Sequence, residues 1–343
     1  MNGYKTLDAI QPKVIREKMR ADDFDYMLPE ELIASRPSAS RESSRMMIVD
    51  REQSTIRSGT FAEFAGFIRD GDLVVLNDTR VVPARFFSDK ERIELLRLDE
   101  PEPQLWRCMV RPGKKMRIGK TVSVAGVTGI VEDILEEGER MVRFQEAIDI
   151  EKHGQLALPH YMDRNPAEED RERYQTVYAR EPGAIAAPTA GLHFTKEMLK
   201  ELPHTFLTLH VGVGTFQPVR ADHITDHKMH SEHFHLSAQS AEAINNCERV
   251  VSVGTTVTRT LEHLAASSRE SLVPGSGETD IFIYPGFEFR RTGALLTNFH
   301  LPKSTLFMLV CAFAGTELMR AAYAQAIKEK FRFYSYGDCM LIL

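Results

Sequence analysis

The sequence is poor in cysteine, in long apolar runs and in excess positive charge. Its four cysteines among 343 residues are widely scattered and form no C-x-x-C pair, which argues against a zinc ribbon or a disulfide framework. No run of about 18 apolar residues, the length that spans a bilayer, is present, and the N-terminus lacks the apolar core of an export signal. We therefore expect a cytoplasmic protein with reduced thiols and no membrane association.

The charge balance limits the kind of nucleic-acid binding that the chain can perform. The formal net charge is −6, the wrong sign for a protein that coats nucleic acid without specificity. Any phosphate-binding surface must be a local patch. Arginines cluster at Arg36, Arg41 and Arg45, and again at Arg80 and Arg85.

Length and hydrophobic pattern predict two domains. The chain exceeds the usual single-domain size, and 43% of its residues are hydrophobic, enough to build real cores. From about residue 86 to residue 150, short alternating segments are separated by proline, glycine and acidic turns, a pattern typical of strands. We predict an α/β main domain with a mixed sheet (residues 1–85 and 151–343), interrupted by an inserted small β-barrel domain (86–150).

Several segments of the main domain have a clear strand or helix pattern. The continuous apolar run 73–76 indicates a strand buried on both faces. Predicted strands alternate with predicted helices along the main domain, which indicates an α/β layer with a largely parallel or mixed sheet. The apolar C-terminal tail predicts a strand that packs on the rest of the domain. The further predicted elements are strands 46–49, 205–213, 249–253, 280–284 and 294–298, and helices 60–68, 167–178 and 257–266.

Two glycine-containing stretches, residues 186–195 and 209–219, concentrate small and polar residues where a core would have bulk. Gly212 and Gly214 occupy alternate positions of an apparent strand, which lets a ligand press against one face while His210 and Thr215 supply hydrogen bonds. A β-bulge followed by a turn also explains such a pattern. Gly254-Thr-Thr256 similarly joins a strand to a helix, where free amides favour an anionic group, although a plain capped helix explains it too.

Residues 222–235 contain five histidines and three carboxylates. His227 and His230 would share a helical face, as metal ligands do, so a metal-dependent hydrolase is an alternative interpretation. Against it, no H-E-x-x-H motif occurs and Lys228 lies between the two histidines. We expect no metal.

Motifs along most of the chain resemble one known family. They are FDYMLPEELIA (24–34), LNDTRVVPAR (76–85), YQTVY (174–178), the two glycine-containing stretches, MHSE (229–232), VGTT (253–256) with Arg259, TNFHLPKS (297–304) and YSYGD (334–338). Together they resemble the queuosine-pathway S-adenosylmethionine:tRNA ribosyltransferase-isomerase family, from about residue 22 to the C-terminus. Three places depart from the family pattern: residues 86–92 lack a glycine-rich entry to the barrel, residues 153–161 keep one proline of three, and residues 1–18 precede the usual start.

The resemblance implies a reaction. Such an enzyme transfers and isomerises the ribosyl moiety of S-adenosylmethionine onto the aminomethyl group of 7-aminomethyl-7-deazaguanine at the tRNA wobble position. Epoxyqueuosine forms, and adenine and methionine leave. S-adenosylmethionine is thus the expected co-substrate and tRNA the expected partner, and we expect a monomer or at most a weak dimer. The chemistry needs a base, an acid near the departing adenine, and exclusion of water.

Four residues are candidates for catalysis. His193 and His300 each lie between small or polar residues and an apolar segment, and histidine transfers protons near neutral pH. A core histidine bonded to backbone is the competing interpretation. Asp78 and Asp338 are candidates to orient these histidines or to bind ribose hydroxyls, although each also suits an Asx-turn.

The candidate cofactor-binding residues follow from the same motifs. Arg259, near a helix N-terminus, is the candidate for the methionine carboxylate, and Arg80 and Arg85 are candidates for tRNA phosphates. The residues expected to line the cofactor cleft are Thr189, Gly191, Gly212, Gly214 and Thr215. A non-catalytic RNA-binding protein remains a further alternative. Such a protein would bind RNA with a steep salt dependence and ignore S-adenosylmethionine.

Overall fold

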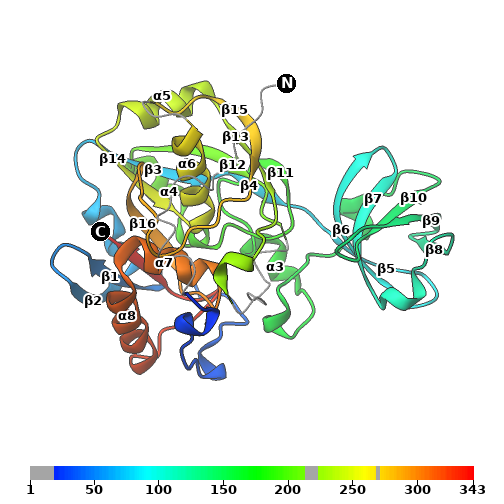
Figure 1. Cartoon of the computed structure of the whole chain (residues 1–343), viewed down its shortest axis with the longest axis horizontal. Helices are drawn as coiled ribbons and strands as arrows, with labels where there is room; N and C mark the ends of the chain where they lie inside the picture. Colours follow the sequence, from blue (N-terminus) through cyan, green and yellow to red (C-terminus); the bar gives the residue numbers. More distant parts are fainter. Residues whose placement is uncertain (1–18, 213–222, 268–270) are drawn as a thin grey trace.

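A computed structural model describes residues 19–212, 223–267 and 271–343. It shows a large body in which helices pack on a central sheet, and a smaller β-sheet set apart at one side (Figure 1). The chain leaves the body after β4 (Thr79–Val81), forms the smaller sheet, and returns at the short helix α2 (Ile150–His153).

Within the described residues, the central sheet has nine strands and is mixed. Their order is β15 (Gly275–Thr279), β13 (Glu232–Leu236), β12 (His204–Leu209), β3 (Asp72–Asn77), β14 (Arg249–Val253), β16 (Thr292–Asn298), β17 (Cys339–Ile342), β1 (Arg45–Asp50) and β2 (Thr55–Thr60). Strands β12, β3, β14 and β16 are parallel neighbours. Strands β17 and β1 also pair in parallel, and the remaining pairs are antiparallel.

Both faces of this sheet are buried, which explains the unbroken apolar run in β3. Val74 and Leu76 pack into one hydrophobic cluster, whereas Val75 packs into another on the opposite face. Each such side chain contributes about 1.5–3 kcal/mol of transfer free energy. One face is covered by α5 (Ala238–Asn246), α6 (Thr255–Ser267), α7 (Thr305–Ala314) and α8 (Thr316–Lys328). The other is covered by η4 (Phe61–Phe67), η7 (Thr189–His193) and α4 (Lys196–Glu201).

Side-chain caps fix where several of these helices begin. Ser304 accepts a hydrogen bond from the Phe307 amide at the start of α7. Ser237 and Thr195 do the same for α5 and α4. A cap of this kind contributes about 1 kcal/mol, because it satisfies an amide that has no partner within the helix. The remaining short helices are η2 (Ala21–Phe24), η3 (Glu30–Leu32), η5 (Gly113–Lys115), η6 (His160–Met162), α3 (Glu168–Arg173) and η9 (Ile224–Asp226).

The smaller sheet, in residues 85–144, is antiparallel and curls around its own core. Its order is β5 (Arg85–Phe87), β6 (Glu94–Glu102), β7 (Leu105–Arg111), β10 (Arg140–Phe144), β9 (Val127–Ile134) and β8 (Thr121–Val124). Trp106 packs between Phe86 and Phe144 in this core. The Asp89 carboxylate, just after β5, accepts hydrogen bonds from the Ala125 and Gly126 amides just after β8. The two edges of the sheet are therefore tied together at one end. A separate parallel pair joins β4 to β11 (Glu181–Ala184).

Most of the elements predicted from the sequence are confirmed, and so is the α/β class with a large mixed sheet. The strand predicted at 280–284 is wrong. That segment has no strand pairing, and β15 lies just before it. Ile281 and Ile283 are nevertheless buried in the core beside α7, so their alternation reflects packing without a hydrogen-bonded neighbour. The helix predicted at 167–178 is limited to α3, and the one at 60–68 is the 3₁₀ helix η4.

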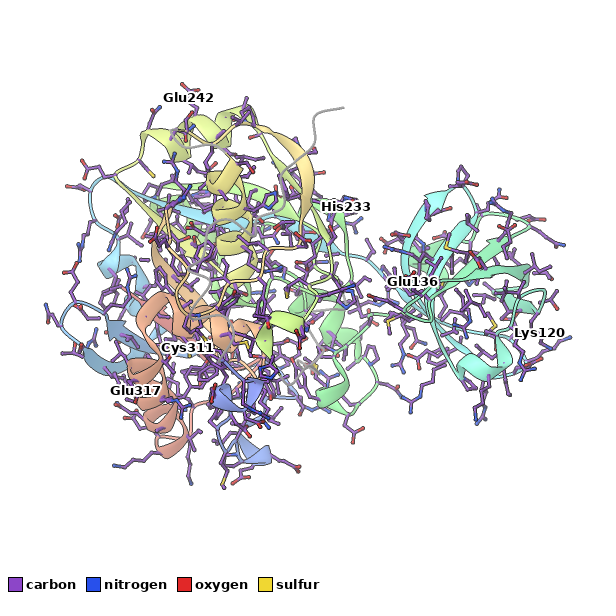
Figure 2. All side chains as sticks on the ribbon, in the orientation of Figure 1. Lys120, Glu136, His233, Glu242, Cys311 and Glu317 are labelled. Atoms are coloured by element: carbon purple, nitrogen blue, oxygen red, sulfur yellow. The ribbon has the colours of Figure 1, made fainter. Side chains whose placement is uncertain are left out.

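Helix α7 is almost entirely apolar and is followed directly by α8. In the described part of the chain, no individual helix has both the length and the apolar composition to cross a bilayer. The two meet these criteria only when taken together, and the chain bends by 116° between them. Cys311 on α7 is buried, while Glu317 on α8 lies at the periphery (Figure 2).

Candidate functional site

Four chain segments that are distant in sequence meet at one edge of the central sheet. Because β3, β12, β14 and β16 are parallel, the residues after their carboxyl ends lie at the same edge. In open α/β sheets this edge is where ligands bind. The four segments are residues 78–79, 210–212, 254–256 and 299–301.

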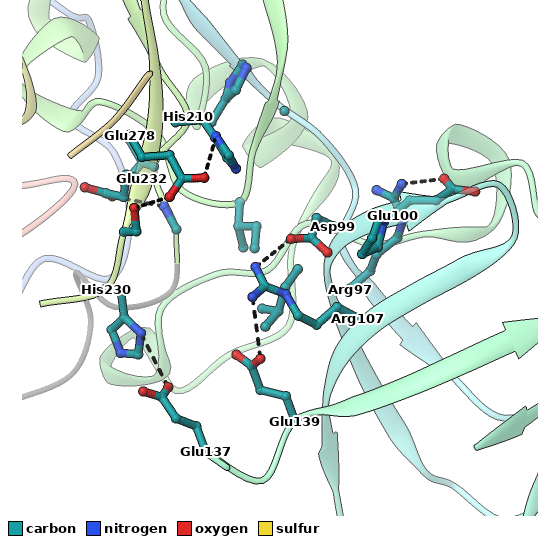
Figure 3. A pocket seen from close by; sticks show the side chains of 18 of the residues that line it. Arg97, Asp99, Glu100, Arg107, Glu137, Glu139, His210, His230, Glu232 and Glu278 are labelled. Atoms are coloured by element: carbon teal, nitrogen blue, oxygen red, sulfur yellow. Dashed lines mark hydrogen bonds and ion pairs between the residues drawn. The ribbon is translucent and has the colours of Figure 1, made fainter. Parts of the chain in front are cut away.

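A cleft of about 1250 Å³ lies between this edge and the smaller sheet (Figure 3). We refer to it below as the cleft. The body contributes His210, Gly212 and Arg259 to its lining, and the smaller sheet contributes mainly charged side chains. One of these, Glu136, lies on the side of the smaller sheet that faces the body, while Lys120 lies on the far side (Figure 2). The cleft thus has two walls from separate parts of the chain.

Arg259 and Glu232 form a buried ion pair at the cleft. Their side chains are 2% and 6% exposed, and Arg259 Nη2 donates to Glu232 Oε2. The Gly212 amide donates to Glu232 Oε1 at 3.2 Å. Among the described residues, Arg259 Nε and Nη1 have no hydrogen-bond partner although they are buried. A buried guanidinium with unused donors is costly, and a planar carboxylate is the ligand that would satisfy it.

The wall on the smaller sheet is rich in acidic groups. Arg107 donates to Asp99 at 2.5 Å and lies 3.8 Å from Glu139, as Figure 3 shows. Burial raises the pKa of Glu139, and Glu137 and Asp99 nearby raise it further. His230 of the body lies 3.5 Å from Glu137 across the cleft. This wall favours cationic groups over phosphates.

A smaller cavity of about 90 Å³, the inner pocket, adjoins the cleft. Val211 and Leu306 line both. Its other lining residues include the polar groups Thr189, Thr255, Thr256, Thr297, Asn298, His300, Ser304 and Ser335. Asn298 is 2% exposed, and its Nδ2 donates to the Tyr334 carbonyl at 2.9 Å. Among the described residues, no hydrogen bond of ordinary geometry reaches its Oδ1, although Asn298 also interacts with the His193 ring and raises the pKa of that histidine. The inner pocket offers this oxygen as an acceptor to a ligand that carries N–H or O–H groups.

The two candidate catalytic histidines are buried and neutral at pH 7. His300 lines the inner pocket and its Nε2 lies 2.9 Å from Thr297 Oγ1. His193 lies outside the linings of the cleft and the inner pocket, with Nδ1 at 3.0 Å from Ser44 Oγ. Burial lowers the pKa of His193 to about 4 and that of His300 to about 3. Their role in proton transfer stays a prediction, and their surroundings resemble those of structural histidines.

The two candidate aspartates are both engaged by other protein groups. Asp78 accepts from Thr208 Oγ1 and from Arg180 Nη2, each at 2.7 Å, and burial raises its pKa. Asp338 accepts from the Arg45 amide at 2.9 Å and the Arg332 amide at 2.8 Å. Neither lines the cleft or the inner pocket. Asp78 nevertheless precedes Thr79, which contacts His210.

The predicted cofactor-binding residues separate into three groups. Thr189 lines the inner pocket, and Gly212 and Arg259 line the cleft. Gly191 lines neither, and a Cβ there would overlap the Tyr178 hydroxyl, so packing within the protein requires this glycine. Gly214 and Thr215 lie outside the described residues.

Comparison with known proteins places the chain in a family. The family described as "Queuosine biosynthesis protein" matches residues 21–342. The chain belongs to this family. It is 49% identical to the S-adenosylmethionine:tRNA ribosyltransferase-isomerase of Pelobacter propionicus and 48% identical to that of Halothermothrix orenii. These matches cover 94% and 95% of this chain and all of each relative.

The structure is also similar to a solved member. A crystal structure of the S-adenosylmethionine tRNA ribosyltransferase from Thermotoga maritima matches with a TM-score of 0.54 and 35% identity. The match covers 94% of this chain and 100% of that one. The queuosine family resemblance predicted from the motifs is therefore confirmed.

In this member of the queuosine family, the described histidines of the histidine-rich segment contact other protein groups. His227 packs edge-on against Phe282, His233 lies 3.3 Å from Glu278, and His235 Nδ1 lies 2.8 Å from Ser276 Oγ. In the described parts of the chain, no three His, Cys, Asp or Glu side chains gather as metal ligands would.

Sequence reasoning missed two residues that the family fold brings to the site. Glu232 and Asn298 lie within the motifs MHSE and TNFHLPKS, but neither was singled out. The signal was their type: an acidic residue at the start of β13 and an amide at the end of β16, next to apolar residues of the same strands. Buried polar side chains need a partner, and both of these residues lie beside a cavity. The candidate phosphate ligands Arg80 and Arg85 are paired with Glu151 and Glu94.

Proposed function

We propose that the chain catalyses transfer and isomerisation of the ribosyl moiety of S-adenosylmethionine onto the aminomethyl group of a 7-deazaguanine at the tRNA wobble position. The products are epoxyqueuosine in tRNA, adenine and methionine. The observation that carries the proposal is the family match over residues 21–342, together with near-complete coverage of the relatives. We further propose that the enzyme is cytoplasmic and acts as a monomer or at most a weak dimer.

The cleft and the inner pocket together suit the two ends of S-adenosylmethionine. Arg259 Nε and Nη1 would receive its carboxylate, since these buried donors have no hydrogen-bond partner among the described residues. The neutral inner pocket would receive the nucleoside, with Asn298 Oδ1 accepting from its amine or hydroxyl groups. Thr189 and His300 would contact the same part. Because Val211 and Leu306 line both cavities, one molecule can occupy both.

We infer that residues 86–150 form an inserted barrel domain that supplies the outer wall of this site. Its continuity in sequence, its separate aromatic core and the Asp89 tie between its edges support this. The acidic wall would repel phosphates and favour the sulfonium of the co-substrate and the ammonium of the aminomethyl group. A wobble base that reaches this depth must leave its stack, as bases do in other nucleic-acid-modifying enzymes.

The test is direct reconstitution. The purified protein is incubated with S-adenosylmethionine and tRNA that carries 7-aminomethyl-7-deazaguanine. Free adenine is followed by chromatography, and digested tRNA by nucleoside mass analysis. We expect adenine release matched by an epoxyqueuosine nucleoside. A folded protein that binds the tRNA and yields neither product would contradict the proposal and support the RNA-binding alternative.

A further inference from the structure

His210 lines the cleft, and the proposed function above gives it no part in the chemistry. It follows β12 directly, at the ligand-binding edge of the sheet, and it lines the cleft together with Gly212. Its backbone amide donates to the His233 carbonyl at 3.0 Å, which holds the main chain in place. Unlike His193 and His300, it is half-buried, so a ligand can reach it.

Two neighbours fix the orientation of the His210 ring. Its Nδ1 lies 2.8 Å from the hydroxyl of Thr79, a fully buried residue. Gly183 packs against the same part of the ring, since a Cβ at that glycine would lie 2.8 Å from Nδ1 and Cε1. Among the described residues, no group forms a hydrogen bond with Nε2. The Nδ1 side of the ring is covered by protein, and Nε2 is the nitrogen available to the cleft.

The hydrogen bonds of the Thr79 hydroxyl are compatible with a proton on His210 Nδ1. When the hydroxyl donates to the Glu181 carbonyl, at 3.4 Å, its oxygen accepts from His210 Nδ1–H at 2.8 Å. A neutral histidine that donates through Nδ1 has a lone pair on Nε2. In this tautomer Nε2 is able to act as a general base toward a ligand in the cleft.

The ring lies close to the proposed anchor for the co-substrate. His210 and Gly212 are two residues apart, on the order of 7 Å along an extended chain. The Gly212 amide touches Glu232, which in turn pairs with Arg259. A co-substrate whose carboxylate is held by Arg259 has only a short aliphatic arm between that carboxylate and its sulfonium. The carbon next to the sulfonium then falls within the region of the cleft that His210 lines.

We propose that His210 is the base that removes a proton from C5′ of S-adenosylmethionine, a role that rests on the proposed function. In this step the C5′–H bond breaks and an Nε2–H bond forms. The electron pair stays on C5′, where the adjacent sulfonium stabilises it, and His210 becomes an imidazolium. Thr79 is a positioning residue for this base.

The charged surroundings of His210 are compatible with a base at neutral pH. The groups that face it are Asp78, Glu181 and His233. Burial lowers the pKa of His210, and His233 lowers it further, while the two carboxylates act in the opposite direction. The ring is therefore mainly neutral at pH 7 and can accept a proton.

The test compares His210→Gln with His235→Gln. His235 is a matched control because its Nδ1 also lies 2.8 Å from a hydroxyl, that of Ser276, but its side chain is exposed away from the cleft. We expect His210→Gln to lower kcat by about 10²–10⁴-fold and to abolish loss of deuterium from C5′-deuterated S-adenosylmethionine. Its Kd for S-adenosylmethionine should change less than threefold, which also shows that the variant folds. His235→Gln should behave as the unmodified protein.

Substitution of Thr79 tests the positioning role. Thr79→Val should lower kcat about tenfold and shift the acid limb of the kcat/KM pH profile, and Thr79→Ser should restore both. Retention of turnover and deuterium loss by His210→Gln would overturn the assignment. If the unmodified protein itself releases no adenine, the proposed function fails instead, so the two failures are distinguishable.

Discussion

The cleft and the inner pocket adjoin one another but differ in chemical character. The cleft is lined by charged and titratable side chains from two parts of the chain, including Arg259, Glu232 and the acidic wall. The inner pocket is lined by hydroxyl, amide and small apolar groups. Burial explains the difference, because an ion far from water needs a charged partner whereas a hydroxyl does not. The cleft is thus suited to bind charged groups of a ligand, and the inner pocket is suited to bind uncharged groups.

The histidines of the two cavities also differ in burial. Burial lowers the pKa of His300 to about 3 in the inner pocket and that of His193 to about 4 nearby. His210 in the cleft is only half-buried. The first setting suits a neutral hydrogen-bonding histidine, and the second suits the proton acceptor that we propose for His210.

Among the variants that compare the two cavities, the largest effect is expected at Arg259. Its substitution tests whether this arginine binds the co-substrate or only stabilises the fold. Arg259→Gln should raise KM for S-adenosylmethionine on the order of 100-fold, since a charge-assisted hydrogen bond contributes about 1.5–3 kcal/mol. Unfolding free energy should also fall, by about 3–5 kcal/mol, because Glu232 is left buried without its partner. Steady-state kinetics and urea denaturation measure the two effects.

Arg249→Gln is the matched control. Arg249 donates to Asp72 from Nε at 2.8 Å, and its side chain is 19% exposed. This pair lies at the amino ends of β14 and β3, the edge opposite the cleft. The variant should lose stability but keep KM for S-adenosylmethionine. An equal rise of KM in both variants would show that Arg259 acts through stability alone.

The pH dependence of the unfolding free energy tests whether the buried His193 is neutral in the folded protein. In the unfolded chain its pKa returns to about 6.5, so below that pH the unfolded state binds a proton that the folded state does not. Unfolding free energy should therefore fall as pH is lowered from about 6.5 to about 4, by about 3 kcal/mol from this residue. Urea denaturation at several pH values should give a shallower slope for His193→Gln. Equal slopes would mean that His193 takes up its proton in the folded protein at the same pH as in the unfolded chain.

Substitution of Gly191 tests whether this glycine is needed to bind the co-substrate or to pack against Tyr178. Because a Cβ at this position would overlap the Tyr178 hydroxyl, Gly191→Ala should destabilise the protein by about 1–3 kcal/mol. The double variant with Tyr178→Phe should recover part of this loss. Thermal unfolding measures both. Unchanged stability with lost S-adenosylmethionine binding would instead support direct contact with the co-substrate.

The smallest effect is expected at Asn298 in the inner pocket. Loss of one neutral hydrogen bond to the nucleoside should lower kcat/KM for S-adenosylmethionine about tenfold in Asn298→Ala, since such a bond contributes about 0.5–1.5 kcal/mol. Asn245→Ala is the control, because its amide only secures Leu272 far from the inner pocket. Equal kcat/KM in Asn298→Ala and the unmodified protein would contradict nucleoside binding there.

Much of the fold could be predicted from the sequence because it depends on local pattern. The apolar runs of β3 and β14 and the alternation in residues 86–144 reflect burial, which is visible in residue type. The site was harder, since partners distant in sequence decide it. Nothing near Gly191 in sequence shows that Tyr178 lies against it, and nothing near His193 shows that Ser44 covers its ring. Arg259 was found because it lies near the N-terminus of a helix and next to the VGTT motif, both of which are visible in the sequence.

The most direct test of the account compares two ligands on two proteins. Binding of S-adenosylmethionine and of its decarboxylated analogue is measured by calorimetry for the unmodified protein and for Arg259→Gln. We predict that the unmodified protein binds S-adenosylmethionine at least tenfold more tightly than the analogue, about 1.4 kcal/mol, and that the variant binds both alike. Discrimination that persists in the variant would place the carboxylate elsewhere and contradict the proposed orientation of the co-substrate.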